Sequence, residues 1–294
     1  MNIQQTFAGA PSATPATGSQ IIVSNVSKTY GTGAFGKRVV HDCTLTLESG
    51  KLTVMIGPSG CGKSTLIRLL AGFERPTSGT ITLDGRPVTG PGRDRLVVFQ
   101  ESALFPWMST YDNIMFGPRA RGEDTPEMRA RAEELLRRVG LEGFRKKYPA
   151  QLSGGMQRRA ELARSMINQP DVMILDEPFR GLDAMTKKLM QEYYSKLFEE
   201  FRRTSFFVTT DIDEAIYLAD RILIMTNIPT QVRSVINVDL PRPRRLEDTI
   251  ENDEANAIKM KALNLLLEEA MKSFARGSKA AADFVDAYAR RKSR

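Results

Sequence analysis

An α/β fold with an inserted helical subdomain is predicted by three changes of pattern along the 294 residues. Residues 21–99 contain short apolar runs separated by turn pairs such as Asp84-Gly85, which is typical of strands. Residues 101–165 become helical, because Thr125 and Pro126 form a helix start and apolar residues recur at helical spacing after them. Residues 171–240 then alternate between strand-like and helix-like segments.

The two ends of the chain have compositions of their own. Residues 1–20 are rich in Ala, Ser, Thr, Pro and Gly without a basic start or an apolar stretch, so we expect a disordered leader and no secretion signal. The run Pro241-Arg-Pro-Arg-Arg245 ends the main domain, which we place at 21–240, and a helical tail follows over 241–294. We expect the apolar stripe of that tail to pack on the domain and its basic end to be solvated; the stripe is Met260, Leu263, Leu267, Met271 and Phe274.

Composition narrows the class of protein. With 41% hydrophobic residues the chain can bury a sizeable core, but no segment approaches the ~18 to 20 consecutive apolar residues of a membrane helix. We therefore do not expect a transport pore. The net charge of +7 is interpreted as solvated surface, with attraction to anionic lipid headgroups or nucleotide as the alternative. Cys43 and Cys61 form no disulfide framework, which favours a reducing, cytoplasmic setting.

A glycine-rich segment has the spacing of a phosphate-binding loop and lies between an apolar run, Leu52 to Ile56, and a helical pattern. Its glycines let backbone N–H groups point inward at an anion, and the helix N-terminus adds favourable potential. We expect Lys63 to reach the β and γ phosphates of ATP and Ser64 to hold Mg²⁺. The whole segment is predicted to bind the nucleotide: Gly57, Pro58, Ser59, Gly60, Cys61, Gly62, Lys63, Ser64 and Thr65.

Cys61 lies in this loop at a helix N-terminus, beside the expected phosphates. This position predicts a depressed thiol pKa and ready alkylation that ATP would prevent, with simple filling of the loop as the alternative.

Two carboxylates follow the apolar run Val172 to Leu175, as expected where a buried parallel strand ends. Asp176 is predicted to hold the Mg²⁺ shell, which leaves Glu177 to polarise the attacking water as general base.

A third segment, Leu152-Ser-Gly-Gly-Met-Gln157, opens a helix with a Ser-Gly-Gly anion cradle. With this segment the chain resembles the ATP-binding cassette (ABC) ATPases. The resemblance implies a P-loop nucleoside triphosphatase core with an antiparallel β subdomain and an inserted helical subdomain at about 101–165. It also implies that the segment contacts the γ-phosphate held by an opposite subunit, through Ser153, Gly154, Gly155 and Gln157.

Single positions extend the resemblance. Tyr30 is similar to the aromatic residue that stacks on adenine, with Phe35 as a rival for that role. Gln100 is similar to the glutamine that touches Mg²⁺ and the attacking water and hinges the helical subdomain. Asp183 is similar to the aspartate that crosses the dimer interface.

The chain departs from the family pattern at two positions. Thr210 stands where the family has a catalytic histidine, and the only histidine, His41, is interpreted as a loop residue. Because a threonine hydroxyl would need a bridging water to reach the γ-phosphate, we expect slow hydrolysis. Arg180 stands where a small residue is expected.

Within the family, the single cassette and the run Leu104-Phe-Pro-Trp-Met108 resemble the ATPases of nitrate, sulfonate or taurine importers. This implies a homodimer or heterodimer at the cytoplasmic face of the inner membrane, integral membrane permease subunits, and indirectly a periplasmic binding protein. Trp107 can be assigned either to the core or to a partner-facing groove, and the resemblance favours the groove. One alternative is a hydrolytically weak subunit paired with a more active one. The other is a soluble cassette acting on nucleic acid. The compact interval between Lys63 and Ser153 disfavours this second alternative, so no nucleic-acid partner is expected.

Overall fold

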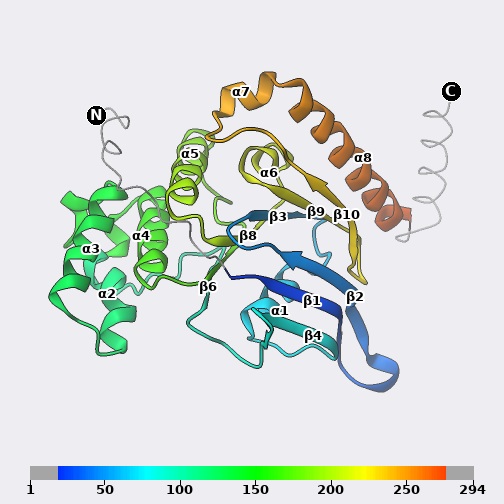
Figure 1. Cartoon of the computed structure of the whole chain (residues 1–294), viewed down its shortest axis with the longest axis horizontal. Coiled ribbons are helices and arrows are strands. Elements are labelled where there is room, and N and C mark those ends of the chain that lie inside the picture. Colours follow the sequence, from blue (N-terminus) through cyan, green and yellow to red (C-terminus); the bar gives the residue numbers. More distant parts are fainter. Residues whose placement is uncertain (1–18, 276–294) are drawn as a thin grey trace.

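The computed structural model describes residues 19–275 and arranges them as two sheets and a helical lobe (Figure 1). The strands are β1 (Ile21–Tyr30), β2 (Lys37–Leu47), β3 (Leu52–Ile56), β4 (Ser78–Leu83), β5 (Arg86–Pro87), β6 (Arg95–Val98), β7 (Val172–Asp176), β8 (Thr204–Thr209), β9 (Arg221–Met225) and β10 (Val232–Asn237). A four-stranded sheet has the order β2-β1-β4-β5, and all its pairs are antiparallel. A six-stranded sheet has the order β10-β9-β3-β8-β7-β6 and is parallel except for β10.

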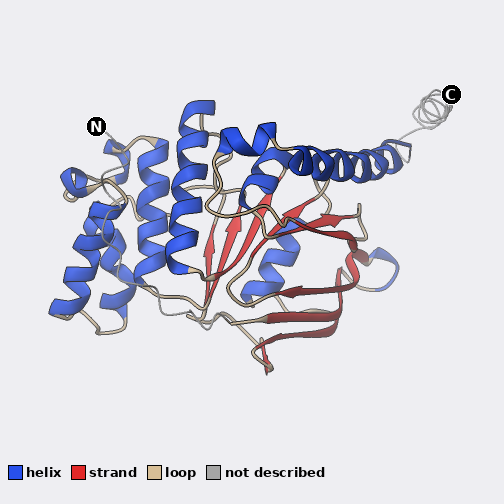
Figure 2. Cartoon of the chain, turned by 45° about the horizontal axis from the view of Figure 1, so that its top comes forward, coloured by secondary structure: helices blue, strands red, loops and turns tan. Residues whose placement is uncertain are grey.

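The helices are α1 (Lys63–Ala71), α2 (Thr110–Ala120), α3 (Pro126–Arg138), α4 (Gly154–Ile167), α5 (Ala184–Phe201), α6 (Ile212–Leu218), α7 (Leu246–Glu251) and α8 (Asp253–Ala275). Short 3-10 helices are η2 (Gly33–Phe35), η3 (Glu142–Phe144) and η4 (Pro149–Gln151). Helices α2, α3 and α4 pack together as a lobe at one side of the six-stranded sheet (Figures 1 and 2). Their starts follow the sequence signals, because the Ser109, Thr125 and Ser153 hydroxyls each accept a backbone N–H of the first turn. The α/β class is confirmed.

The centre of the molecule is strand β3, whose five residues are all buried. A buried strand in a parallel sheet is apolar on both faces, so it separates two cores. One core joins α1 to both sheets through Leu66, Leu70, Val23 and Phe206. The other core joins the opposite face of the six-stranded sheet to α4, α5, α6 and α8. The nucleotide loop is therefore held between two packed layers.

Helix α8 buries a different face from the one expected. Ala255, Ile258 and Ala262 are buried on it, and it packs on α6 and β9. In contrast, Met260, Leu263 and Phe274 are 56%, 43% and 57% exposed, so the prediction that the whole stripe packs on the domain is wrong. The small side chains bring the helix close to the core and turn the larger ones outward.

Part of the sequence interpretation lies outside the described residues. This applies to positions 1–18 of the expected leader and to the basic end at 290–294. Ser19 and Gln20, the last two leader positions, are hydrogen-bonded to Thr204 and Asp84. Within residues 19–275, no helix has the length and apolar character needed to cross a membrane.

Candidate nucleotide site

Strand register brings the sequence motifs to one edge of the parallel sheet. Ile56 at the end of β3 pairs with Thr209 at the end of β8, and Asp176 at the end of β7 pairs with Val208. The glycine loop, the two carboxylates and Thr210 therefore all follow neighbouring strands at their carboxyl ends. This is the edge where open α/β sheets bind ligands.

The glycine loop closes around a buried lysine. Lys63 Nζ donates to the carbonyls of Gly57 and Pro58 at 3.1 Å each, and the residue is only 8% exposed. Gly62 caps α1 with a φ of 98°, and a Cβ there would lie 2.8 Å from Thr230 Oγ1. Only glycine tolerates this backbone. A buried ammonium with a third proton to give, at a helix N-terminus, is suited to bind phosphate.

The surroundings of Cys61 are the opposite of those expected for a reactive thiol. It is 1% exposed, and burial raises the pKa of its thiol above the ordinary value, although Lys63 acts in the opposite sense. The expected depression of this pKa is wrong, because desolvation of the thiolate outweighs the nearby positive charge.

The acidic pair lies beside this lysine. Burial raises the pKa of Asp176, the charge of Glu177 raises it further, and Lys63 lowers it. Glu177 is 8% exposed and has a φ of 41°, and its backbone N–H donates to the Val208 carbonyl at 2.9 Å. Its carboxylate accepts from Arg180 Nη1 at 3.1 Å. Arg180 stands at a position where a small residue is expected, and it contacts the candidate general base, Glu177, directly.

Mg²⁺ fits these residues through oxygen ligands. The Ser64 hydroxyl, the Asp176 carboxylate and the Gln100 amide are the hard donors that Mg²⁺ prefers, and nucleotide phosphates usually complete such a site. Burial is the largest cause of the raised pKa of Asp176, and Lys63 and Arg68 offset it only in part, so a bound cation would favour the ionised carboxylate. Among residues 19–275, no group of three or more His, Cys, Asp or Glu could hold a metal by itself.

Gln100 follows β6 and is exposed, and no hydrogen bond of the described chain joins its amide to Asp176 or Ser64. Its backbone is fixed instead, because Arg158 of α4 donates to the carbonyls of Phe99 and Gln100 at 2.7 and 2.6 Å. Glu161 completes this clamp by pairing with Arg158 at 2.6 Å and accepting from the Ala103 N–H. Sequence reasoning missed both clamp residues. Two opposite charges three positions apart in α4, the signature helix that segment 152–157 opens, were the available signal.

The signature segment, residues 152–157, leads into α4, which begins at Gly154. Ser153 caps the helix by accepting from Met156 N at 3.3 Å, and Ser153 and Gly154 are exposed, whereas Gly155 is buried against Thr186. Gln157 uses its amide to brace the carbonyls of Pro149 and Leu152. Among the described residues, no hydrogen bond links Ser153 or Gly154 to the glycine loop of the same chain. The cradle therefore faces outward.

Tyr30 lies at the end of β1 near the start of α1. Its hydroxyl donates to Glu74 at 2.7 Å and lies 3.5 Å from Thr65 Oγ1, and the residue is 36% exposed. Phe35, the rival for adenine stacking, is 93% exposed in η2. The contact with Thr65 places Tyr30 beside the nucleotide loop.

The last two predicted residues lie at helix starts. Asp183 caps α5 by accepting from Thr186 N at 3.0 Å, and hydrogen bonds from Thr186 lower its pKa. Thr210 is exposed directly after β8. Its neighbour Asp211 caps α6 and pairs with Lys187 at 2.7 Å.

Comparison with known proteins agrees with this geometry. Residues 40–180 match the family model described as ABC transporter. The chain is 43% identical over 217 residues to an aliphatic sulfonates import ATP-binding protein of Bacillus licheniformis, which spans 74% of this chain and 84% of that protein. This chain belongs to the ATP-binding cassette family. It is also 43% identical over 244 residues to a nitrate import ATP-binding protein of Synechococcus elongatus, spanning 82% of this chain and 89% of that protein.

A solved ATP-binding cassette has the same fold. That structure is a dimer in a post-hydrolysis state bound to ADP and Pi; the TM-score is 0.65 at 28% identity, and the match covers 75% of this chain and all of the other. The resemblance to ABC ATPases and the P-loop fold with two subdomains are confirmed. The cassette is an ATPase whose ligands are ATP and Mg²⁺.

Proposed function

We propose that this cassette drives the import of a small anion of the nitrate or sulfonate type through separate permease subunits. Two relatives that are 43% identical over most of the chain are named for nitrate and for aliphatic sulfonates, which are both anions. The cassette would bind peripherally at the cytoplasmic face of the inner membrane. A periplasmic binding protein would deliver the solute on the other side.

The proposed catalytic unit contains two chains. Ser153 and Gly154 of one chain close on an ATP bound at Lys63 of the other, because this cradle is exposed and faces away from its own loop. Glu177 acts as the general base, and Asp176, Ser64 and Gln100 hold Mg²⁺. Closure around ATP moves the membrane subunits, and hydrolysis reopens the pair.

An exposed group of aromatic side chains supports a permease contact on the helical lobe. We call Phe105, Trp107 and Phe116 the aromatic patch. Trp107 is 70% exposed and Phe116 is 40% exposed, and their rings lie 5.5 and 4.6 Å from the Phe105 ring. Exposed aromatic groups of this kind mark contact sites with partners.

The aromatic patch is connected to the nucleotide site through α4. Arg164 of α4 donates to the Ala103 carbonyl at 2.8 Å and covers the Phe105 ring at 5.4 Å. Arg158 of the same helix holds Gln100. These contacts of one helix with both the patch and Gln100 are the observation that carries the transport proposal. A movement of α4 on ATP-driven closure would shift the patch.

Purification with the permease tests it. Trp107→Ser should lose co-purification with the membrane subunits and their solute-dependent stimulation of hydrolysis, while ATP affinity stays unchanged. Phe144→Ser is the matched control, because Phe144 is an aromatic residue of the same lobe, 39% exposed and outside the patch. Full permease binding by Trp107→Ser would contradict the proposed docking surface.

A second candidate, a hydrolytically weak subunit paired with a more active one, is supported by Thr210 and Arg180. Thr210 lacks the imidazole that the family has at this position, and Arg180 pairs with Glu177. Subunit composition of the purified transporter distinguishes the two candidates. A second, different cassette would favour the weak subunit.

A further inference from the structure

The turn between β9 and β10, residues 226–231, lies against the glycine loop. A Cβ on Gly57 would lie 3.0 Å from the Cβ of Met225, the residue that ends β9. A Cβ on Gly62 would lie 2.8 Å from Thr230 Oγ1. The strand end and the turn therefore support the loop from behind at its first glycine and at the glycine that caps α1.

Thr230 is fixed in this turn through its backbone. Its N–H donates to the Val39 carbonyl at 2.7 Å, and its own carbonyl accepts from the His41 N–H at 3.0 Å. The residue is 1% exposed, and its Oγ1 has no hydrogen-bond partner within residues 19–275. Thr230 therefore acts on Gly62 by contact and not by a hydrogen bond.

Helix α8 holds the other end of the turn. It packs on β9, at the end of the six-stranded sheet opposite the helical lobe (Figure 1). The Glu269 carboxylate accepts from the Asn227 backbone N–H at 3.2 Å, and the Glu269 carbonyl accepts from the Asn227 side-chain amide. The turn is closed on itself, because Thr226 Oγ1 donates to the Asn227 carbonyl at 3.0 Å and accepts from the Gln231 N–H at 2.9 Å. A shift of Glu269 would therefore move Asn227 and Thr230 together.

Glu269 is 3% exposed and yet is held in its charged form. Burial raises the pKa of its carboxyl, but hydrogen bonds from Lys272 and Asn227 and the charges of Lys272 and Arg233 lower it by more. Lys272 Nζ lies 2.6 Å from Glu269 Oε1. An ionised acceptor makes stronger hydrogen bonds than a neutral one, so the carboxylate holds Asn227 firmly. Glu268, the next residue, is exposed and pairs with Arg233 at 3.1 Å.

Taking residues 57–65 as the nucleotide loop, we propose that Glu269 is a positioning residue for that loop: it holds the turn, and the turn keeps Gly62 where its N–H faces a phosphate. Glycine allows many backbone conformations, so a loop without this support would populate several of them. The observed affinity falls in proportion to the fraction of chains in the binding conformation. Glu269 thereby sets ATP affinity from a helix outside the predicted nucleotide-binding residues.

Calorimetry of ATP binding to the full chain measures the effect. A hydrogen bond to a charged group is worth ~10- to 100-fold in an equilibrium constant. Glu269→Ala should weaken ATP by the lower value, ~10-fold, because Thr230 keeps its bonds to β2. Glu269→Gln should restore most of the affinity, since its amide oxygen still accepts from Asn227. Glu268→Ala is the matched control and should leave ATP affinity unchanged.

Steady-state hydrolysis separates positioning from catalysis. In Glu269→Ala the KM for ATP should rise ~10-fold, whereas kcat at saturating ATP should stay within about twofold of the unsubstituted chain. The reason is that bound nucleotide selects the binding conformation of the loop, so the defect disappears once ATP is in place.

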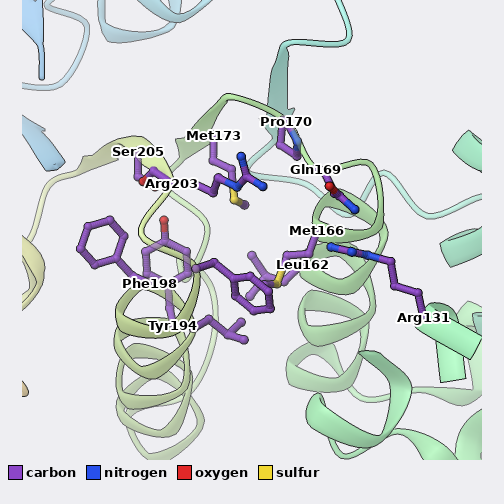
Figure 3. Close-up of a pocket in the computed structure, with 12 residues that line it drawn as sticks. Arg131, Leu162, Met166, Gln169, Pro170, Met173, Tyr194, Phe198, Arg203 and Ser205 are labelled. Carbon is purple, nitrogen blue, oxygen red and sulfur yellow. Dashed lines mark hydrogen bonds between the residues drawn. The ribbon is translucent and has the colours of Figure 1, made fainter. Parts of the chain in front are cut away.

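A second control separates positioning from a general loss of stability. Phe198 is 3% exposed beside a cavity of about 30 Å³ between α4, α5 and the amino ends of β7 and β8, at the sheet edge opposite the nucleotide site (Figure 3). Phe198→Leu should lower the midpoint of urea unfolding, because buried volume is lost there. Its Kd for ATP should not change.

A double-mutant cycle tests the route through the turn. Thr230→Ala removes the side chain behind Gly62 and should weaken ATP binding, as Glu269→Ala does. Because Glu269 acts through Thr230, the double variant should lose no more affinity than the weaker of the two single variants. Independent effects would multiply instead.

Three results would overturn the positioning role. They are unchanged ATP affinity in a folded Glu269→Ala chain, an equal loss of affinity in Glu268→Ala or Phe198→Leu, and losses that multiply in the double variant. Each of them refutes the role of Glu269 alone where Lys63→Ala abolishes ATP binding. Retained ATP affinity in Lys63→Ala would overturn the loop assignment and the positioning role with it.

Discussion

Replacing Arg158 by methionine removes a buried cation that fixes the segment after β6 to the signature helix. Its guanidinium makes three short contacts, of 2.6 to 2.7 Å, with the carbonyls of Phe99 and Gln100 and with the Glu161 carboxylate. The two charged side chains are 7% and 3% exposed, so solvent screens them little. Removal of one partner of a buried pair costs ~3 to 5 kcal/mol of unfolding free energy.

The lower half of that range is expected for Arg158→Met. Burial already raises the pKa of Glu161 against the opposing charge of Arg158, so the orphaned carboxyl takes up a proton more readily and loses part of its desolvation penalty. We therefore expect a loss of ~3 kcal/mol. Substituting both residues, Arg158→Met with Glu161→Leu, removes the unpaired acid and should recover part of this loss.

Urea denaturation measures these differences. Arg129→Met is the control, since Arg129 forms an exposed pair with Asp124 at 2.7 Å, and such pairs contribute ~1 kcal/mol or less. If Arg158→Met were no less stable than Arg129→Met, the clamp would not stabilise the fold and the reasoning would be refuted.

Three further predictions concern the nucleotide site. Lys63→Ala should abolish the ATP binding that calorimetry measures, because the phosphates lose a buried counter-charge. Unchanged ATP affinity would contradict the assignment of residues 57–65 as the nucleotide-binding loop. Thr210→His should raise the hydrolysis rate at least several-fold, since one preorganised donor is worth ~10² to 10³ in rate; an unchanged rate would make Thr210 a neutral variant. Arg180→Gly should raise kcat with ATP affinity unchanged, because it frees the Glu177 carboxylate from its 3.1 Å contact, and an equal or lower kcat would show that Arg180 assists the base.

Local chemistry made much of the site predictable from the sequence. The glycine loop and the acids after β7 follow from phosphate geometry and from where buried strands end. The relation between Ile56, Asp176 and Thr210 was also predictable, because parallel strands align their carboxyl ends.

Features that depend on packing were not predictable. The pKa of Cys61 was expected in the wrong direction, because sequence position shows the helix N-terminus but not the burial that opposes it. The exposed face of α8 was assigned to the core for the same reason, since helical spacing does not identify the face that meets a neighbour. The contact of Arg158 with Gln100 joins residues far apart in sequence. No local pattern encodes such a contact.

Size-exclusion chromatography of Glu177→Gln with Mg-ATP tests the central claim, that ATP is hydrolysed in a site shared by two copies. This variant should turn over ATP ~10²- to 10⁴-fold more slowly, the range for loss of a general base, and should elute as a dimer only with ATP. Adding Gly154→Asp should abolish that dimer, because the new carboxylate repels the γ-phosphate, while a Cβ there meets only Leu182 at an ordinary 3.4 Å. A Glu177→Gln chain that stays monomeric with saturating ATP, or a dimer that Gly154→Asp leaves intact, would contradict the shared site.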